Sequence, residues 1–297
     1  MRILCVGEAT YDINYLIQDS VLENAQILAC DKVECGGGIS SNIAYLLAKW
    51  KMETYFVGTI GKDNNGKEIL KEFNDVGVKT NFLEINKKTT TISNTIISNK
   101  NNFLSTIINY KKDDISTDIE IDITPDIIVV DGTEYELSLK ILKEFPKAKS
   151  FMSLTKFSKD DIELIKKVDY VICPIELASY LTNIKVNYKN THSLIEVYTK
   201  LSKAFKNLII SLNDIGYLYE MEGSVKIMPC MKVEKVNDVG SHDIFVGAFI
   251  YGISNKFNKE KSLKYANIAS SLSKTKLGGR VSIPELIEVE DIYESLK

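Results

Sequence analysis

Ten residues near the C-terminus carry the clearest chemistry in the chain, and they read V-N-D-V-G-S-H-D-I-F from Val236 to Phe245. Gly240 and Ser241 can turn backbone N–H groups toward an anion, and Asp243 falls in the first turn of the helix that follows. A helix start offers unpaired donors and the positive end of its dipole, which suits a phosphoryl group in transfer. A carboxylate beside it can take a proton from an attacking hydroxyl. The same residues also fit an ordinary capped helix.

A second segment joins a predicted strand to a predicted helix through three successive glycines. It runs from Cys35 to Asn42 and reads C-G-G-G-I-S-S-N. The glycines permit positive φ angles or close approach of a ligand to the backbone. Ser40 or Ser41 can cap the helix, which explains the serines but not the glycine run. The segment therefore predicts a docking site.

Two further stretches complete a pattern in the C-terminal quarter. A small-residue-rich helix is predicted over Leu263 to Thr275, and Leu277 to Arg280 reads L-G-G-R before Ile283 and Pro284. Together with the segment ending in Asp243, this quarter resembles the end of the ribokinase family, also called the PfkB carbohydrate kinases. That family ends its motif in a Gly-x-Gly-Asp turn that runs into a helix.

The resemblance implies roles for the turn. The acid matched by Asp243 is the catalytic base of the family. The backbone N–H groups matched by Gly240, Ser241 and His242 form its anion hole. His242 stands where the family has glycine, which leaves two outcomes. The imidazole either points away and leaves the donors usable, or it obstructs the anion hole and slows catalysis.

The resemblance also implies a substrate side. The family's Gly-Gly and Asn that contact a sugar or nucleoside match Gly37, Gly38 and Asn42, although Ser40 stands where the family has a smaller residue or proline. Asp12 matches an acid that accepts hydrogen bonds from two hydroxyls. A carboxylate only accepts, which suits a polyol, whereas Asp12 without the resemblance reads as a surface residue in a turn.

On the nucleotide side the family pattern is only partly present. A Thr-x-Gly-x-x-Gly turn is matched by S-L-N-D-I-G, of which Ser211, Asn213 and Gly216 carry over. Asparagine tolerates the left-handed conformation better than most residues. The resemblance further implies that Asn267 and Gly278 contact the nucleotide.

Two elements that serve ions in the family are altered. ATP and Mg²⁺ are the cofactors implied, but the family's Asn-x-x-Glu is not recovered near Cys173, so no protein ligand of Mg²⁺ is identifiable. Glu176 is the acid nearest to that place and is a candidate for a metal-water role. Asn237 replaces the acid found six residues before the base, which weakens a monovalent-cation site.

One motif is rejected. Gly61 to Glu68 reads G-K-D-N-N-G-K-E and nearly satisfies the P-loop pattern after a predicted strand. The last position requires Ser or Thr to hold Mg²⁺, and a carboxylate at Glu68 would repel phosphates. The segment matches the Gly-x-Asp-x-x-Gly element of the family instead. No G-x-G-x-x-G follows the first strand, so the dinucleotide-binding fingerprint is missing as well.

From Asp126 onward, short apolar runs alternate with helical patterns, which predicts a mostly parallel sheet flanked by helices. Runs such as Ile127 to Val130 are continuously apolar, as strands covered on both faces should be. These patterns predict an α/β fold. The resemblance implies that it is ribokinase-like, with three layers over a single domain of residues 1–297.

The first third carries strands with interleaved polar residues, over about 11–17, 27–35 and 90–110. The tetrad from Asn99 to Asn102 should close a hairpin between Thr91–Ser98 and Leu104–Asn109. These strands predict a small sheet, which in the family forms a lid over the sugar. An apolar outer face on that lid could support a homodimer or simply cover the large domain.

Composition excludes several classes of protein. The 297 residues are 44% hydrophobic and 26% charged with a net charge of -3, which is typical of a globular protein without a basic stripe for nucleic acid. No apolar run is long enough to span a bilayer, and the N-terminus is too short and acidic for a secretory signal. Five cysteines without a C-x-x-C favour reduced thiols in the cytoplasm.

These observations favour an ATP-dependent kinase that phosphorylates a hydroxymethyl group of a sugar or nucleoside. The alternative is a binding or regulatory protein of the same fold with impaired catalysis, because of His242 and the missing Asn-x-x-Glu. A third possibility is an unrelated α/β enzyme that shares only the architecture, but no other cofactor fingerprint is present.

Overall fold

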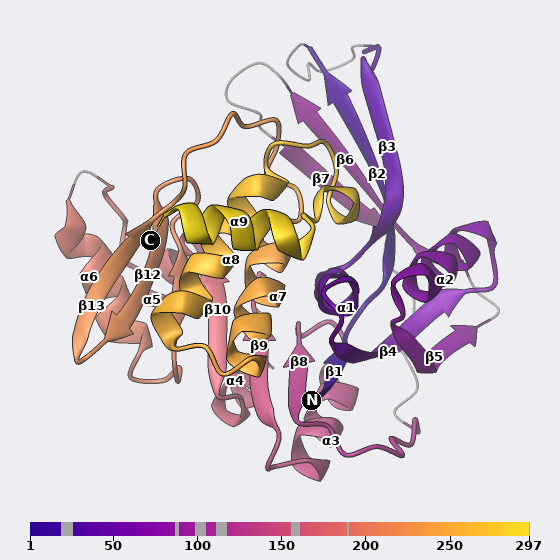
Figure 1. Ribbon diagram of the computed structural model, residues 1–297, viewed down its shortest axis with the longest axis horizontal. Helices are drawn as coiled ribbons and strands as arrows, with labels where there is room; N and C mark the ends of the chain where they lie inside the picture. The colour runs from indigo at the N-terminus through magenta and orange to yellow at the C-terminus, as the bar shows by residue number, and fades with distance from the viewer. Residues whose placement is uncertain are drawn as a thin grey trace.

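The computed structural model describes residues 1–18, 26–86, 89–98, 105–110, 118–155, 161–188 and 190–296, with the backbone alone for 105–110. Over these residues the chain forms one large sheet between two layers of helices and one small separate sheet (Figure 1). The strands of the large sheet are β1 Arg2–Val6, β4 Glu53–Gly61, β5 Lys79–Asn86, β8 Ile127–Val130, β9 Lys149–Ser153, β10 Tyr170–Pro174, β11 Ile209–Ser211, β12 Gly216–Met221 and β13 Ser224–Pro229.

The large sheet is mostly parallel. Its strands stand in the order β13-β12-β11-β10-β9-β8-β1-β4-β5. The pairs from β5 across to β11 are parallel, and β12 and β13 add an antiparallel edge. Ile127 to Val130 are fully buried, as predicted for a strand covered on both faces.

Helices cover both faces of this sheet. One layer contains α1 Ile39–Lys49, α2 Asn64–Val76, α7 Ser241–Ser254, α8 Lys259–Ser273 and α9 Leu286–Ser295. The other contains α3 Tyr135–Glu144, α4 Asp161–Lys167, α5 Ile175–Thr182 and α6 Thr191–Leu201. Alternate residues of β1 serve the two cores, because Ile3 and Cys5 pack with the first layer and Leu4 and Val6 with the second. The predicted three-layer α/β architecture is confirmed.

In Figure 1 the small sheet lies at the upper right, above α1. It contains β2 Thr10–Ile17, β3 Asp31–Gly37, β6 Thr91–Ser98 and β7 Ser105–Tyr110, in the order β3-β2-β6-β7. β6 and β7 are antiparallel, as expected for a hairpin, while the tetrad predicted to turn between them lies outside the described residues. One boundary differs from the prediction, since residues 27–30 lie outside any strand and β3 begins at Asp31.

The start of α2 shows what the P-loop-like segment does. The Asp63 side chain accepts a hydrogen bond from the Gly66 backbone N–H at 2.9 Å and another from the Thr90 N–H at 2.8 Å. The helix start is therefore capped by a carboxylate of the chain itself, which agrees with rejecting an anion site there.

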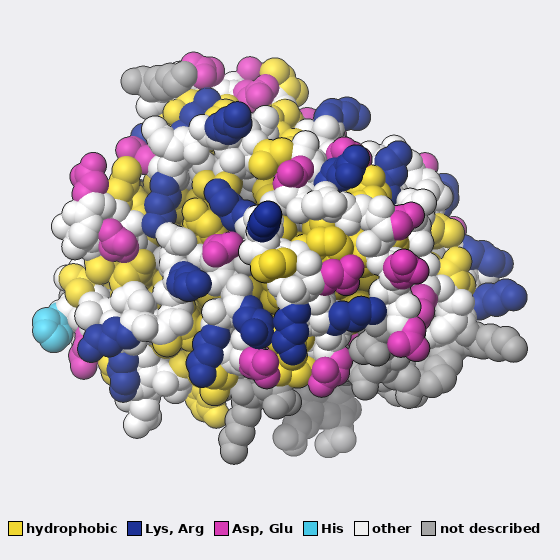
Figure 2. All heavy atoms as spheres, turned by 90° about the horizontal axis from the view of Figure 1, so that it is seen from below, with side chains coloured by type: hydrophobic (Ala, Val, Ile, Leu, Met, Phe, Trp, Pro, Cys, Tyr) yellow, Lys and Arg dark blue, Asp and Glu magenta, His cyan; other side chains and the backbone are white. Residues whose placement is uncertain are grey.

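The charged surface is mixed on the face shown in Figure 2, where basic and acidic side chains alternate around small apolar areas. Within the described ranges, no helix combines the length and apolarity needed to cross a membrane.

Candidate active site

The start of α7 has the geometry of an anion-binding turn. Gly240 has φ of 74°, and a Cβ there would lie 3.0 Å from the Gly279 Cα, so both the backbone angle and the close neighbour favour glycine. The Ser241 N–H donates to the Asp238 carbonyl at 3.1 Å and is already engaged. His242 and Asp243 occupy the first helical turn, where backbone N–H groups have no partner within a helix. Their amides are the best placed to receive an anion.

His242 fits this turn without backbone strain. It lies inside α7 with helical dihedrals, and the positive φ belongs to Gly240. Its Nε2 atom is buried and has no hydrogen-bond partner among the described residues. Burial lowers the pKa of the imidazole to about 4, so the ring is neutral at physiological pH.

Asp243 is a buried acid held by a neighbouring amide. Asn42, from α1, donates its Nδ2 to Asp243 Oδ2 at 2.9 Å. Burial raises the pKa of Asp243 to about 7; the Asn42 bond opposes that rise, while nearby Asp12 and Asp131 add to it. A carboxyl with this pKa can accept a proton near neutral pH.

Asp12 lies against the glycine run. A Cβ on Gly37 would stand 2.0 Å from Asp12 Oδ2, so only glycine allows the carboxylate to approach that backbone. Thr10 donates its hydroxyl to Asp12 Oδ1 at 2.6 Å. Burial raises the pKa of Asp12 to about 6. Gly38 follows as the residue before α1. The substrate-side residues predicted from the sequence therefore lie close together.

Arg280, from the L-G-G-R stretch, is a buried cation of this site to which the sequence assigned no role. It is 2% exposed and donates to Asn42 Oδ1 at 3.3 Å, to Glu72 Oε2 at 2.7 Å and to the Ser41 hydroxyl. Glu72 in turn accepts from the Gly36 N–H at 3.0 Å. Because Arg280 occupies Oδ1 of Asn42, the amide must present its NH₂ group to the acid beside it.

Asp131 is the other residue that was missed. It directly follows β8 and accepts hydrogen bonds from the backbone N–H groups of Ser40 and Thr133, each at 3.0 Å. Burial raises its pKa. An acid directly after a buried parallel strand was the available signal, because ligands of such sheets bind at the carboxyl ends of strands.

On the nucleotide side, the predicted turn follows β11. Ser211 ends that strand, and Asn213 has the left-handed φ of 57° that its residue type allows. Asn213 donates its Nδ2 to Glu176 Oε1 at 2.7 Å, which places the proposed metal-water acid beside this turn. Gly216 begins β12 and packs against the Met228 carbonyl of β13.

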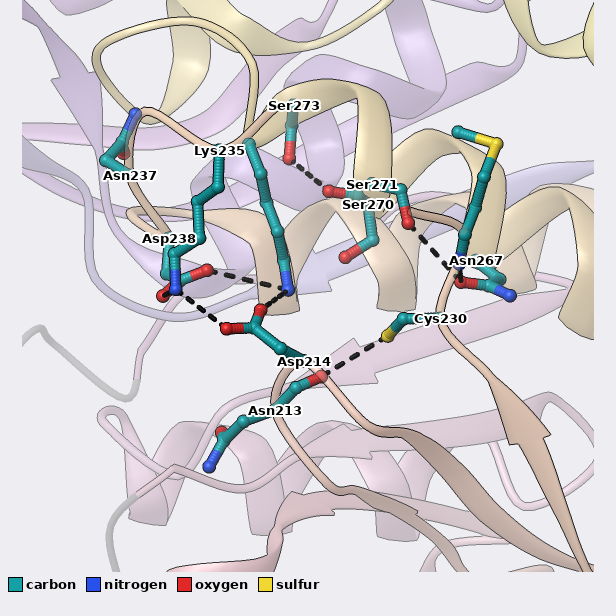
Figure 3. A network of polar contacts seen from close by, with 12 residues as sticks. Asn213, Asp214, Cys230, Lys235, Asn237, Asp238, Asn267, Ser270, Ser271 and Ser273 are labelled. Carbon is teal, nitrogen blue, oxygen red and sulfur yellow. Dashed lines mark hydrogen bonds and ion pairs between the residues drawn. The ribbon is translucent and has the colours of Figure 1, made fainter. Parts of the chain in front are cut away.

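A four-charge network joins this turn to the loop before α7 (Figure 3). Lys274 bridges Asp214 at 2.9 Å and Asp238 at 3.5 Å, and Lys235 contacts the same two acids. Burial alone would raise the pKa of Asp214, but the hydrogen bonds from Lys274 and Lys235 lower it. These charges are paired within the chain.

The other nucleotide-side residues are held by the chain as well. Asn237 donates its Nδ2 to the Lys276 carbonyl and accepts from the Val239 N–H, so both ends of its amide are used. Asn267 donates to the Pro229 carbonyl at 2.8 Å and accepts from the Met231 N–H at 3.3 Å.

Gly278 lies beside the Val33 side chain of β3. It therefore stands next to the small sheet, apart from the contacts that engage Asn267.

The described residues do not form a metal site of their own, since no three His, Cys, Asp or Glu side chains among them are grouped to hold an ion. Mg²⁺ commonly keeps several waters and binds through one or two carboxylates together with substrate phosphates. Glu176 is the acid that lies beside the nucleotide turn.

Comparisons with known proteins agree with this arrangement. The family model described as pfkB family carbohydrate kinase matches residues 1–286. The ribokinase of Lactococcus lactis subsp. lactis (strain IL1403) is 25% identical over 276 residues, which cover 88% of this chain and 86% of that protein.

Solved structures share the fold. Ribokinase from Thermotoga maritima has a TM-score of 0.82 at 21% identity and covers 98% of this chain and 99% of that one. Arabidopsis thaliana ribokinase complexed with ribose and ATP has a TM-score of 0.80 at 20% identity and covers 98% and 97%. Because the family model spans nearly the whole sequence, the chain belongs to the pfkB family of carbohydrate kinases.

Proposed function

We propose that this chain transfers the γ-phosphoryl group of ATP to a hydroxymethyl group of a sugar or sugar-like substrate, with Asp243 as the general base. One observation carries the assignment. Asp243 is a buried acid with a pKa raised to about 7, at the start of a helix whose first-turn amides face no helical partner.

The acceptor side orients the substrate. The Asp12 carboxylate accepts hydrogen bonds from hydroxyl groups, and the Asn42 amide, fixed by Arg280, lies between the sugar and the base. Asp243 takes the proton from the attacking hydroxyl group while the oxygen of that hydroxyl bonds to the γ-phosphorus. The bond from that phosphorus to the bridging oxygen breaks, and ADP leaves.

The start of α7 stabilises the charge that passes through the transition state. The backbone N–H groups of His242 and Asp243 and the positive end of the helix dipole lie where the transferring oxygens carry negative charge. Because the imidazole of His242 is neutral, it adds no positive charge for an incoming phosphate, and the backbone N–H groups supply the donors.

Mg²⁺ would arrive with the nucleotide, and Glu176 is the residue placed to contact its water shell. The metal would neutralise phosphate charge when bound. A monovalent-cation site at Asn237 has less support, because both ends of that amide already bond to the chain.

The small sheet is proposed as a lid over the acceptor side. Its outward face presents half-buried apolar side chains, among them Ile13, Tyr15 and Ile96. The same face on a second copy of the chain would cover them, which supports a homodimer formed through this sheet.

A second candidate is a sugar-binding protein with weak catalysis. The observation that favours it lies on the nucleotide side, where the Asn267 amide bonds to the chain at both ends rather than being left for a nucleotide.

ADP release measured with a panel of sugars and nucleosides tests the two candidates. Asp243→Asn should lower kcat by about 10²–10⁴-fold and leave sugar binding within a few-fold, because the base is lost while the other contacts remain. The matched control is Asp126→Asn, which changes an acid that precedes β8 and bonds to the Arg2 N–H. Full turnover in the Asp243 variant would show that the base assignment is wrong. Sugar binding without ADP release by the unmodified chain would favour the second candidate.

A further inference from the structure

The small sheet contains a buried amide without a partner. Asn14, in the middle of β2, is 0% exposed, and neither its Oδ1 nor its Nδ2 has a hydrogen-bond partner among the described residues. Buried polar side chains in native proteins are nearly always hydrogen-bonded. An amide with both ends unsatisfied is therefore a candidate to bind a ligand.

The strand register places this amide on the same side of the sheet as Asp12. Asn14 lies two residues beyond Asp12, so both side chains point to the same face, about 7 Å apart along the strand. Val33 is opposite Asn14 on β3, and its side chain lies 3.0 Å from where a Cβ on Gly278 would stand. That face therefore looks toward the turn before Arg280 and the start of α7.

The neighbouring strand adds further polar groups to the same face. Ser93 is in register with Asp12 and Thr95 with Asn14, and these two side chains are 7% and 1% exposed. The opposite face carries half-buried residues such as Ile13 and Tyr15. This face therefore carries an acid, an amide and two hydroxyls beside the apolar Val33 and Ile97. Such a group of acceptors and donors matches a hydroxyl-rich ligand.

We propose that Asn14 is a specificity-determining residue whose amide binds two adjacent polar groups of the acceptor. One is a hydroxyl that donates to Oδ1, and the other is an oxygen that accepts from Nδ2. Because Asn14 lies one step farther from the base than Asp12, these groups belong to the part of the substrate remote from the transferred hydroxyl. This assignment rests on the proposed function, which makes this face the acceptor side.

The test replaces Asn14 by Leu, which has a similar volume and no polar atoms. The matched control is Asn94→Leu on the adjacent β6, since Asn94 is in register with Ile13 and points to the opposite face. The probes are D-ribose, D-fructose and adenosine. Two quantities are measured for each protein, namely the shift in melting temperature that each probe produces and kcat/KM for ADP release.

The expected result separates binding from stability. Asn14→Leu should melt at the same temperature as the unmodified protein or higher without a probe, because an unsatisfied buried amide is removed. It should lose the probe-dependent shift, and its kcat/KM should fall about 10–100-fold with the KM for ATP unchanged. Asn94→Leu should keep both the shift and the kcat/KM.

Three outcomes would overturn the assignment. One is a kcat/KM within threefold of the unmodified protein in Asn14→Leu. Another is a lower melting temperature without a probe together with an unchanged shift, which would mark a structural role. The third is the absence of any shift in the unmodified protein with all three probes. A shift that depends on Asn14 in a protein that releases no ADP would instead refute the kinase activity and leave the role of Asn14 standing.

Discussion

The acids on the two halves of the site differ in the direction of their pKa shifts. On the acceptor side, Asp12, Asp131 and Asp243 are acids whose pKa values are raised, first of all by burial. On the nucleotide side, hydrogen bonds from Lys274 and Lys235 lower the pKa of Asp214. The acceptor side thus holds three acids for which no ion pair with a cation is found among the described residues, although Arg280 and Glu72 form an ion pair beside them, whereas the four charges of the nucleotide side are paired with one another.

The difference leads us to expect that the acceptor side carries the acid–base chemistry. A buried carboxyl that lacks a counter-ion costs free energy, and hydroxyl donors of a ligand can recover part of that cost. Paired charges have little to gain from a ligand, but they fix the backbone around them. We therefore expect changes on the acceptor side to act on catalysis and changes on the nucleotide side to act more on stability.

The largest effect that sharpens this contrast is expected at Arg280. Arg280→Met should lower kcat/KM for the sugar by about 100-fold, because the Asn42 amide loses the donor that sets its orientation and Glu72 loses its cation. Arg280→Lys keeps the charge but not the fork of donors, so it should recover only part of the activity. Steady-state kinetics and a melting curve check both variants, and a kcat/KM within threefold for a folded Arg280→Met would contradict the positioning role.

The contacts of Arg280 could not be predicted from the sequence. The continuously apolar strands and the alternation of strand and helix correctly predicted the parallel sheet, because those patterns are local. Arg280 contacts Glu72 across 208 positions and Asn42 across 238, and no local pattern reports such a pair.

The nucleotide side illustrates the same limit in another form. Asn213 has the left-handed conformation that its residue type allows, but the charge network around Lys274 was not predicted. Its members come from the turn after β11, the loop before α7 and the end of α8, and each reads as an ordinary surface charge. The hairpin of β12 and β13, which follows this turn, was not predicted either.

The raised pKa of Asp243 predicts a pH dependence of the reaction. The base must be ionised, so kcat/KM should be constant above about pH 7 and fall about tenfold per pH unit below it. Asp12→Asn removes one neighbouring negative charge, so the acid limb should move to lower pH, by less than the shift that burial causes. An acid limb near pH 4 in the unmodified protein would show that Asp243 is not perturbed.

The same group predicts the sign of a stability effect. Its pKa is raised in the folded chain, so the folded state favours the protonated form. The stability that protonation contributes is complete below pH 3.8 and is lost as the pH rises through about 7. Asp243→Asn should therefore stabilise the chain at pH 8, by on the order of 1–3 kcal/mol, and much less at pH 4.

The smallest catalytic effect is expected from breaking the charge network of the nucleotide side. The Lys274 side chain is 8% exposed and that of Lys235 is 21%, so Lys274→Met removes the more deeply buried of the two cations that pair with Asp214 and Asp238. The two acids are 59% and 43% exposed, so solvent screens the charges left behind. Lys274→Met should therefore lower the free energy of unfolding by only about 1 kcal/mol and raise the KM for ATP about 3–10-fold, with the KM for the sugar unchanged. Denaturant unfolding and kinetics with each substrate varied in turn measure these effects, and Lys235→Met should give smaller changes of the same sign. A sugar KM that rises as much as the ATP KM would mean that the two halves are coupled, and the contrast between them would fail.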